Sequence, residues 1–224
     1  MCGRFTLQID QQVLVDHFHL DHIGDHYRKH YNIAPGQDIA IIRRNVVGER
    51  YLHCAHWGLI PSWVREKSIG NKLINARAET ITEKPSFRTA FKKRRCIIPA
   101  DGFYEWRQEN GKQPYRITDE SGRPLAMAGL WEHWQSPEGK RIESCTIITT
   151  QANEEMSWLH NRMPVILQHD AFEPWLNNSG TDIEFARSLL LPYAEALRIY
   201  PVSRAVNSPR NDEPNLIDEI TPSP

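Results

Sequence analysis

Short runs of apolar and β-branched residues, separated by turn-forming residues, recur along most of the chain. The runs typical of strands are DIAIIRR at 38–44, RYLHCAHW at 50–57, RCIIP at 95–99, GFYEWR at 102–107, PYRIT at 114–118, PLAMAGLWEHW at 124–134 and IESCTIITT at 142–150. Gly, Pro and Asn separate many of these runs at short intervals, as in NVVGE, GKQP and ESGRP. The pattern predicts hairpins, the first of them across NVVGE, and therefore antiparallel pairing.

Helical signals are fewer than strand signals. Asp10 is placed to cap a short helix, and Asn153 is placed to cap NEEMSWLH. Further helices are expected in AETIT at 78–82, DAFEPWL at 170–176 and TDIEFARSLL at 181–190. Many strands with a few inserted helices predict an α+β fold: a single domain of mainly antiparallel strands forming a partly closed barrel with surrounding helices. We expect this domain to span residues 1–210, followed by an acidic, proline-containing C-terminal tail at 211–224.

Length and composition narrow the class of protein. The 224 residues suit one domain with a sizeable core. No apolar run is long enough to span a membrane, and the start MCGRFTLQID lacks the features of a secretory signal. A cytoplasmic, nucleoid-associated protein is therefore expected. The four cysteines are widely spaced and the ten histidines form no HExxH or Cys/His cluster, so we expect no metal and no cofactor.

Charge is distributed unevenly although the net charge is only −1. Residues 1–116 contain 19 basic and 12 acidic side chains, giving +7, and residues 117–224 carry −8. The run KPSFRTAFKKRR from Lys84 to Arg95 contains six cations and no acid. Such asymmetry is a reason to test for a polyanionic partner. The run taken alone is more typical of the solvated basic face of a helix.

Cys2 has the most distinctive chemistry in the chain. Because Gly3 follows it, methionine aminopeptidase can remove Met1 and expose an α-amine beside the thiol. Reference pKa values of about 7.7–8.0 for the amine and about 8.5 for the thiol leave both groups partly deprotonated near neutral pH. The amine can act as base for the thiol, or the two groups can add in turn to one aldehyde and close a thiazolidine ring. The alternative is that Cys2 is only a small buried apolar residue.

Three other segments supply polar side chains suited to proton transfer or anion binding. Alternation along GFYEW puts Glu105 on the face of Phe103, where burial would raise its pKa. His160 in SWLHNRMP is expected at a helix end, where the dipole favours its charged form. Asn75 and Arg77 lie around an expected helix start in INARAET. Each feature also has a structural interpretation: a carboxylate paired with an arginine at a sheet rim, a C-capping histidine and a nonspecific helix start.

Eight motifs together resemble the SRAP family (SOS-response-associated peptidase), whose members sense abasic sites in single-stranded DNA. The motifs are MCGRF at 1–5, YNIAPGQ at 31–37, HWGLIPSW at 56–63, NARAET at 75–80, RCIIPADGFYEW at 95–106, AGLWE at 128–132, TIITTQAN at 146–153 and HNRMPVIL at 160–167. They cover the chain nearly end to end and follow one another in order. One such motif would be weak evidence for the resemblance, but eight motifs in the same order are specific to the family.

The resemblance implies a SRAP-like domain with a basic cleft for single-stranded DNA, working as a monomer without a membrane partner. The catalytic positions that it implies are Cys2, Asn75, Glu105 and His160, and the implied DNA contacts are Arg4, Arg77 and Arg162 to phosphates with Trp106 and Pro35 beside bases. The implied function is an abasic-site sensor. It would form a covalent thiazolidine crosslink through Cys2 after Met1 removal and shield the lesion from strand cleavage.

Two other functions fit the same residues. One is a cysteine peptidase that cleaves its own chain just before Cys2, with Glu105 and His160 as helpers. The other is a non-covalent binder of single-stranded DNA, which the basic half and the seven tryptophans would support equally well. A complex that survives denaturation distinguishes covalent capture from simple binding.

Overall fold

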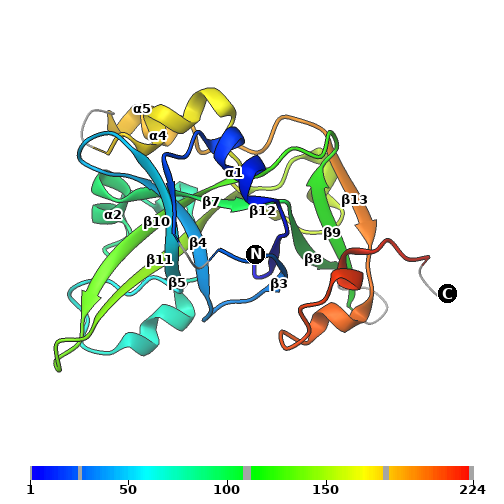
Figure 1. Cartoon of the computed structure of the whole chain (residues 1–224), viewed down its shortest axis with the longest axis horizontal. Helices are drawn as coiled ribbons and strands as arrows, with labels where there is room; N and C mark the ends of the chain where they lie inside the picture. Colours follow the sequence, from blue (N-terminus) through cyan, green and yellow to red (C-terminus); the bar gives the residue numbers. More distant parts are fainter. Residues whose placement is uncertain (1, 25–26, 108–111, 179–181, 222–224) are drawn as a thin grey trace.

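The computed structural model describes residues 2–24, 27–107, 112–178 and 182–221. Its strands are β1 Phe5–Leu7, β2 His22–Ile23, β3 His30–Ile33, β4 Asp38–Arg44, β5 Arg50–Trp57, β6 Asn75–Arg77, β7 Arg95–Ala100, β8 Gly102–Arg107, β9 Gln113–Asp119, β10 Leu125–Gln135, β11 Arg141–Gln151, β12 Arg162–Pro164 and β13 Leu197–Pro201. They form two sheets, a five-stranded sheet in the order β13-β9-β8-β1-β3 and an eight-stranded sheet built around β11 (Figure 1).

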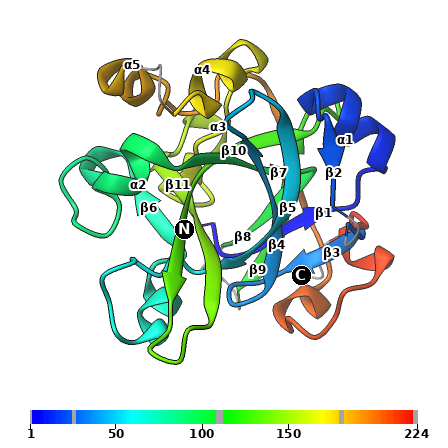
Figure 2. The ribbon, with the colours of Figure 1, turned by 60° about the vertical axis from the view of Figure 1, so that its left-hand side comes forward.

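The helices are short and lie around the strands (Figure 2). The α-helices are α1 Gln11–Phe18, α2 Arg88–Lys93, α3 Glu154–Ser157, α4 Phe172–Leu176 and α5 Ile183–Ser188, and the 3₁₀ turns are η1 Lys67–Lys72, η2 Ala78–Thr80, η3 His169–Ala171, η4 Arg204–Asn207 and η5 Pro214–Ile217. Asn153 caps α3 as predicted, because its side chain accepts a hydrogen bond from the amide of Met156 at 3.0 Å. In the part of the chain that the structure describes, no helix is long and apolar enough to cross a membrane.

Strands β11, β10, β7, β4 and β5 close into a barrel, which Figure 2 shows as a ring. Most neighbours in this ring are antiparallel, including β10 with β11 and β4 with β5. The ring closes where β5 pairs in parallel with β11, at His56 opposite Ser144 and Trp57 opposite Cys145. The predicted α+β fold with a barrel of mainly antiparallel strands is therefore confirmed, and its closure is complete.

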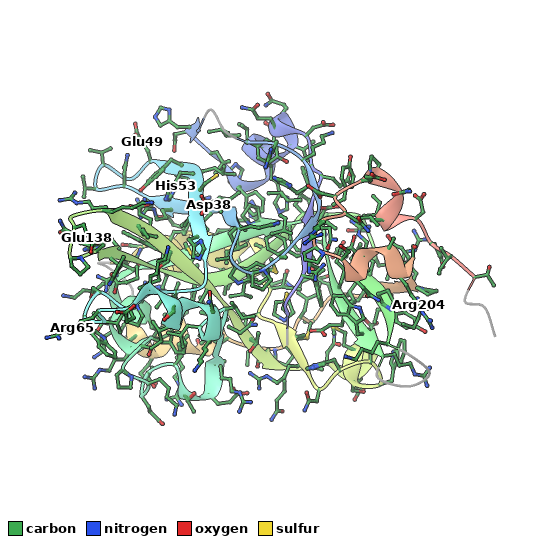
Figure 3. All side chains as sticks on the ribbon, turned by 90° about the horizontal axis from the view of Figure 1, so that it is seen from below. Asp38, Glu49, His53, Arg65, Glu138 and Arg204 are labelled. Atoms are coloured by element: carbon green, nitrogen blue, oxygen red, sulfur yellow. The ribbon has the colours of Figure 1, made fainter. Side chains whose placement is uncertain are left out.

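The five-stranded sheet packs one face against the barrel core. Phe5 of β1 and Phe103 of β8 are fully buried on that face, and the ring of Phe5 lies edge-on to Trp57 at a centroid distance of 5.3 Å. The opposite face carries a second apolar cluster that contains Tyr104 and Tyr200. Figure 3 marks the barrel side of the molecule with Arg65 and Glu138 and the other side with Arg204. The sheet is thus covered on both faces, which fixes the direction of each side chain on β8.

The chain beyond residue 210 continues along the five-stranded sheet. Asp212 accepts hydrogen bonds from the backbone amides of Tyr31 at 2.6 Å and Asn32 at 3.0 Å. Leu216 is buried in the second cluster, and the amide of Ile220 donates to Pro201 at 3.0 Å. The described part of the acidic tail therefore contacts the domain. The domain boundary at residue 210 stays a prediction.

In the basic run between Lys84 and Arg95, the first four cations are exposed on or just before α2, as the solvated helix face predicts, but the last two are not. Arg95 is fully buried, and its guanidinium donates to the carbonyls of Trp175, Phe91 and Asn177 at 2.8, 2.9 and 3.0 Å. Burial lowers the pKa of Arg95 to about 10. This residue therefore ties α2 and α4 to the barrel. Arg94 is paired with a buried glutamate of β10, so neither of the last two cations of the run projects freely from a basic surface.

Two segments differ from their predicted secondary structure. Asn75 and Arg77 lie in strand β6 instead of at a helix start, and a single 3₁₀ turn follows. Arg162 begins strand β12, since the helix capped by Asn153 already ends at Ser157. Both strands have three residues, too few for an alternating pattern to be visible. Their conformation is set by hydrogen bonding to β11 and not by local sequence preference.

Gly58, directly after β5, and Gly70 in η1 approach each other closely. A Cβ on Gly58, whose φ is +141°, would lie 2.7 Å from the carbonyl oxygen of Gly70. We predict that Gly58→Ala lowers the free energy of unfolding by about 3 kcal/mol in urea titrations, through backbone strain and this clash. Gly122→Ala is the control: its φ is +77° with nothing within 4 Å, so we expect a loss of about 1–2 kcal/mol. Equal losses would contradict a role for the close approach.

Candidate active site

Strand β11 brings two of the predicted site segments together. Its Thr149 lies opposite Arg77 of β6 on one edge and opposite Pro164 of β12 on the other. Asn75 is two residues before Arg77, and Arg162 is two residues before Pro164. The motifs NARAET and HNRMP, which are far apart in sequence, therefore meet across one strand.

Cys2 lies fully buried before β1 and contacts the β6 segment. Its carbonyl oxygen accepts a hydrogen bond from Asn75 Nδ2 at 2.9 Å. Burial raises the pKa of the Cys2 thiol well above its usual range, and the nearby Glu105 carboxylate raises it further. The thiol is consequently protonated at neutral pH. Asn75 Oδ1 is also buried and, within the described residues, has no hydrogen-bond partner.

Glu105 occupies the position that strand alternation predicts. It shares a face of β8 with Phe103 in the main core, whereas Tyr104 and Trp106 belong to the cluster on the other face. Only 4% of Glu105 is exposed. Burial raises the pKa of the Glu105 carboxyl, and the positive potential of His160 acts in the opposite direction. The expected raised pKa is thus confirmed in direction.

His160 completes a connected group of four residues. It follows α3, and its Nδ1 accepts a hydrogen bond from the backbone amide of Arg162 at 2.9 Å. The carbonyl oxygen of Arg162 lies 3.1 Å from the same Nδ1, so we assign the tautomer from the shorter contact with the amide, which puts the proton of the neutral ring on Nε2. Asn75 contacts Cys2, Cys2 interacts electrostatically with Glu105, and Glu105 interacts with His160. Two buried titratable groups with raised pKa values, Cys2 and Glu105, flanked by polar side chains are typical of a functional site.

Two of the predicted phosphate contacts lie beside this group. Arg162 forms a two-pronged ion pair with Glu79, at 2.5 and 3.0 Å, and donates to the carbonyl of Thr149 at 2.6 Å. Arg162 lowers the pKa of the Glu79 carboxyl, and Arg77 adds to this effect. Arg77 itself is exposed. Arg77 is therefore accessible from solvent, whereas the guanidinium of Arg162 is already paired with Glu79.

Arg4 and Trp106 lie on the opposite face of β8 from Glu105. Arg4 Nη1 donates to Asn32 Oδ1 at 2.8 Å, and its guanidinium carbon is 5.7 Å from the centre of the Trp106 ring. Trp106 Nε1 donates to Asn207 Oδ1 at 2.6 Å. These interactions connect Arg4 and Trp106, the two predicted DNA-binding residues, to each other and to the C-terminal segment. Burial lowers the pKa of Arg4.

Pro35 is exposed in the turn between β3 and β4. The turn is typical of a Pro-Gly sequence, because Gly36 has a φ of +86° and the amide of Gln37 approaches the carbonyl of Ala34 at 3.4 Å. The side chain of Gln37 also accepts a hydrogen bond from the amide of Ala34 at 3.0 Å. Pro35 is therefore held rigidly at the surface.

Sequence reasoning did not identify Glu79 and Thr149 as parts of this site. Both lie in motifs that were recognised, NARAET and TIITTQAN. Their contribution is to hold Arg162, Glu79 by its carboxylate and Thr149 by its main-chain carbonyl. The sequence does not show which backbone carbonyl will accept a hydrogen bond from an arginine. A glutamate near the surface is also too common to be identified from sequence as the partner of Arg162.

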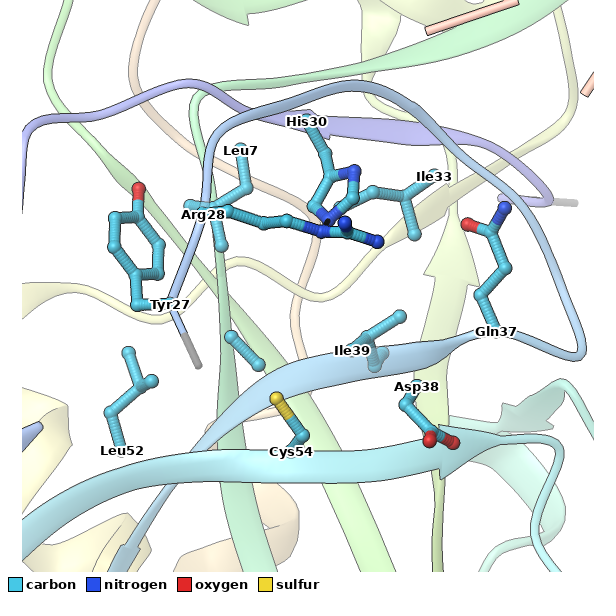
Figure 4. Close-up of a pocket in the computed structure, with 11 residues that line it drawn as sticks. Leu7, Tyr27, Arg28, His30, Ile33, Gln37, Asp38, Ile39, Leu52 and Cys54 are labelled. Carbon is cyan, nitrogen blue, oxygen red and sulfur yellow. Dashed lines mark hydrogen bonds between the residues drawn. The ribbon is translucent and has the colours of Figure 1, made fainter. Parts of the chain in front are cut away.

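A cavity of about 530 Å³ is lined by residues of β1, β3, β4 and β5 and by Gln37 of the Pro35 turn (Figure 4). Its walls include Leu7, Ile39 and Leu52, with Arg28 Nε placed 3.0 Å from His30 Nε2 at the polar side. None of the nine predicted site residues lines it. Within the described residues, no group of three or more His, Cys, Asp or Glu is arranged to hold a metal ion. The candidate chemistry therefore rests on the Cys2 group and not on this cavity.

Most of the chain matches a single protein-family model. Residues 1–209 match the family model described as SOS response associated peptidase (SRAP). The chain belongs to the SRAP family. The resemblance inferred from the eight motifs is confirmed.

Relatives within the SRAP family include proteins of bacteria and vertebrates. The chain is 47% identical over 223 residues to abasic site processing protein YoqW of Bacillus subtilis (strain 168), covering 97% of this chain and 99% of that protein. It is 36% identical over 228 residues to abasic site processing protein HMCES of Xenopus tropicalis, covering 88% of this chain and 68% of that protein. The similarity to the bacterial relative therefore extends over nearly the whole chain.

Solved structures agree with this SRAP assignment. A crystal structure of a protein from Bacteroides thetaiotaomicron superimposes with a TM-score of 0.86 at 29% identity, covering 98% of this chain and all of the other. One from Bordetella bronchiseptica gives 0.78 at 32% identity, covering 90% of this chain and all of the other. The barrel and the added sheet are thus shared with these proteins.

The buried carboxyl generates a prediction about stability and pH. The folded pKa of Glu105 lies above its unfolded value of about 4.3, so ionisation destabilises the fold as pH rises through the folded pKa. We expect Glu105→Gln to be more stable than the parent at neutral pH, by about 1.4 kcal/mol for each pH unit that separates the folded from the unfolded pKa. This gain should disappear below about pH 4. Urea titrations of the parent and Glu105→Gln between about pH 4 and neutral pH measure this difference in the free energy of unfolding.

Glu79→Gln provides the matched control for this measurement. The pKa of Glu79 is lowered, so its contribution to stability is present at neutral pH and is lost as pH falls through the folded pKa. Removing it should lower stability slightly at neutral pH, the opposite sign to Glu105→Gln. A gain for Glu105→Gln that does not change with pH would contradict the assigned burial effect.

Proposed function

We propose that this SRAP protein recognises abasic sites in single-stranded DNA and captures them covalently through Cys2 after Met1 is removed. The observation that carries the proposal is the group that buried Cys2 and Glu105 form with half-buried Asn75 and His160. It is supported by the names of two relatives, YoqW and HMCES, both called abasic site processing proteins. The enzyme would need no cofactor, because the chemistry uses only an amine, a thiol and proton-transfer groups.

The first step is attack by the amine. An abasic deoxyribose exists partly as an open-chain aldehyde, and the α-amine of Cys2 adds to its carbonyl carbon. Loss of water gives a Schiff base. Asn75 supports this step because its Nδ2 fixes the Cys2 carbonyl, while its buried Oδ1 is a suitable acceptor for an amine proton. His160 supplies the Nε2 proton for opening the sugar ring.

The second step is ring closure by the thiol. The sulfur forms a bond to the imine carbon, the imine electron pair moves to nitrogen, and nitrogen takes up a proton. Because the thiol has a raised pKa, a base must accept its proton during attack. Glu105 is the base, since its charge already acts on the thiol. The products are a thiazolidine and the water released earlier. With no imine left, β-elimination and strand cleavage are blocked.

DNA binding would use the phosphates around the lesion. Exposed Arg77 and the ion-paired Arg162 flank the reacting group and are the proposed phosphate contacts. Half-buried Arg4 is a further proposed phosphate contact, and half-buried Trp106 and exposed Pro35 are proposed to lie beside bases. Phosphate contacts make binding of single strands salt-dependent. Monomeric state and cytoplasmic, nucleoid-associated location stay predictions.

The same residues support a second activity, removal of Met1 by the protein itself. The Cys2 thiol would attack the carbonyl carbon of Met1, with Glu105 taking the thiol proton and His160 protonating the Cys2 amine as it leaves. Water would then hydrolyse the resulting thioester, which releases Met1 and restores the thiol. Mass spectrometry of purified Glu105→Gln tests this directly. Retention of Met1 in that variant, with its loss in the parent, would support self-cleavage. Loss of Met1 in both assigns the step to an aminopeptidase.

Incubation with abasic single-stranded DNA and denaturing electrophoresis tests the crosslink. We expect Cys2→Ala to give no stable adduct, because it keeps the amine but cannot close the ring. Adding cyanoborohydride should restore an adduct in this variant by reducing the Schiff base. Cys54→Ala, which removes the exposed free thiol, should crosslink like the parent. A stable adduct in Cys2→Ala without reductant would falsify the ring-closure step. If the protein only binds the DNA non-covalently, neither the parent nor any variant will give an adduct after denaturation.

A further inference from the structure

An aromatic side chain with no assigned role lies beside the candidate active site. Trp158 is the C-cap residue of α3, two positions before His160, and 49% of it is exposed. Its ring lies edge-on to Tyr115, with a centroid distance of 5.2 Å and an interplanar angle of 88°. The guanidinium carbon of Arg107 is 5.6 Å from the ring centre. The indole is therefore held in place by its neighbours while much of its surface meets solvent.

The register of β8 and β9 connects this aromatic residue to the reacting group. Tyr115 is the cross-strand partner of Glu105, so both side chains project from the same face of the sheet. Arg107 is two residues beyond Glu105 and projects from that face too. Glu105, Tyr115, Trp158 and Arg107 therefore form a continuous strip that leads from the buried carboxyl to the surface.

The composition of the strip fits a nucleotide better than an apolar partner. A half-exposed indole offers a flat surface on which any base can stack. Arg107 adds a positive charge next to it, which is suited to a phosphate. A protein partner would call for a wider apolar area, whereas Trp158 is bordered by a charged side chain. The strip also begins at the group that would hold the abasic sugar. The sugar–phosphate backbone of bound single-stranded DNA can therefore pass along it.

We propose that Trp158 is a stacking platform for a nucleobase that flanks the abasic site, and that Arg107 contacts the phosphate next to that base. This inference rests on the proposed function, because the strand is placed by the sugar at Cys2. The platform would add affinity without reading sequence, since every base has a stacking face. Trp158 is then a positioning residue that acts on binding and takes no part in the chemical steps.

Two unreactive strands test the platform independently of the crosslink. Both carry a tetrahydrofuran abasic analogue at the centre; one is flanked by ordinary bases and the other by further baseless tetrahydrofuran units with the same phosphates. We expect Trp158→Ala to weaken binding of the base-flanked strand about tenfold and to leave binding of the baseless strand unchanged. Trp158→Phe should restore most of the affinity, and Arg107→Ala should weaken both strands.

Phe185→Ala is the matched control, because Phe185 on α5 has the same 49% exposure and lies outside the strip. It should not alter either affinity. Equal weakening of both strands by Trp158→Ala, or no weakening of the base-flanked strand, would overturn the platform. Crosslinking of a genuine abasic strand is scored separately at saturating DNA, where Trp158→Ala should react at the parent's rate. Failure of the parent to crosslink would contradict the proposed function and would leave the two binding results to decide the platform.

Discussion

Pairing along both edges of β11 is the constraint on which the barrel and the candidate site both depend. Its first half closes the barrel through β10 and the parallel partner β5, and its second half holds β6 and β12. Asn75 and Arg77 come from one of those short strands and Arg162 from the other. A shift in the register of β11 would therefore open the barrel and separate the residues proposed to bind the sugar and its phosphates. Fold and chemistry are coupled through one strand.

Burial of a thiol beside a carboxyl gives the site its chemical character. An ordinary thiol nucleophile depends on a lowered pKa, but burial raises the pKa of Cys2, and Glu105 raises it further. Such a thiol needs a neighbouring base to accept its proton before it can attack. It is suited to a second step in which the amine has already delivered an imine carbon and Glu105 accepts the proton. The raised pKa therefore favours aldehyde capture by the amine and thiol together over hydrolysis by the thiol alone.

Sequence patterns predicted those features that depend on local alternation and capping. The strands at 38–44, 50–57 and 102–107 have the predicted bounds, and Glu105 lies on the predicted face because β8 is long enough to alternate. Strands of three residues, such as β6 and β12, were missed because only their pairing with β11 defines them. The buried Arg95 looked like part of a basic surface, since its three carbonyl partners leave no trace in sequence.

The central claim is that the amine and thiol of Cys2 both end in one ring with the abasic carbon. Mass spectrometry of the crosslinked complex, after digestion of the DNA and the protein, tests it most directly. The account predicts a peptide that begins at Cys2 and carries the abasic nucleotide with the loss of one water. This peptide should be unchanged by borohydride and unreactive towards thiol alkylation. An adduct on any other residue, or a Cys2 thiol that still alkylates, would contradict the account.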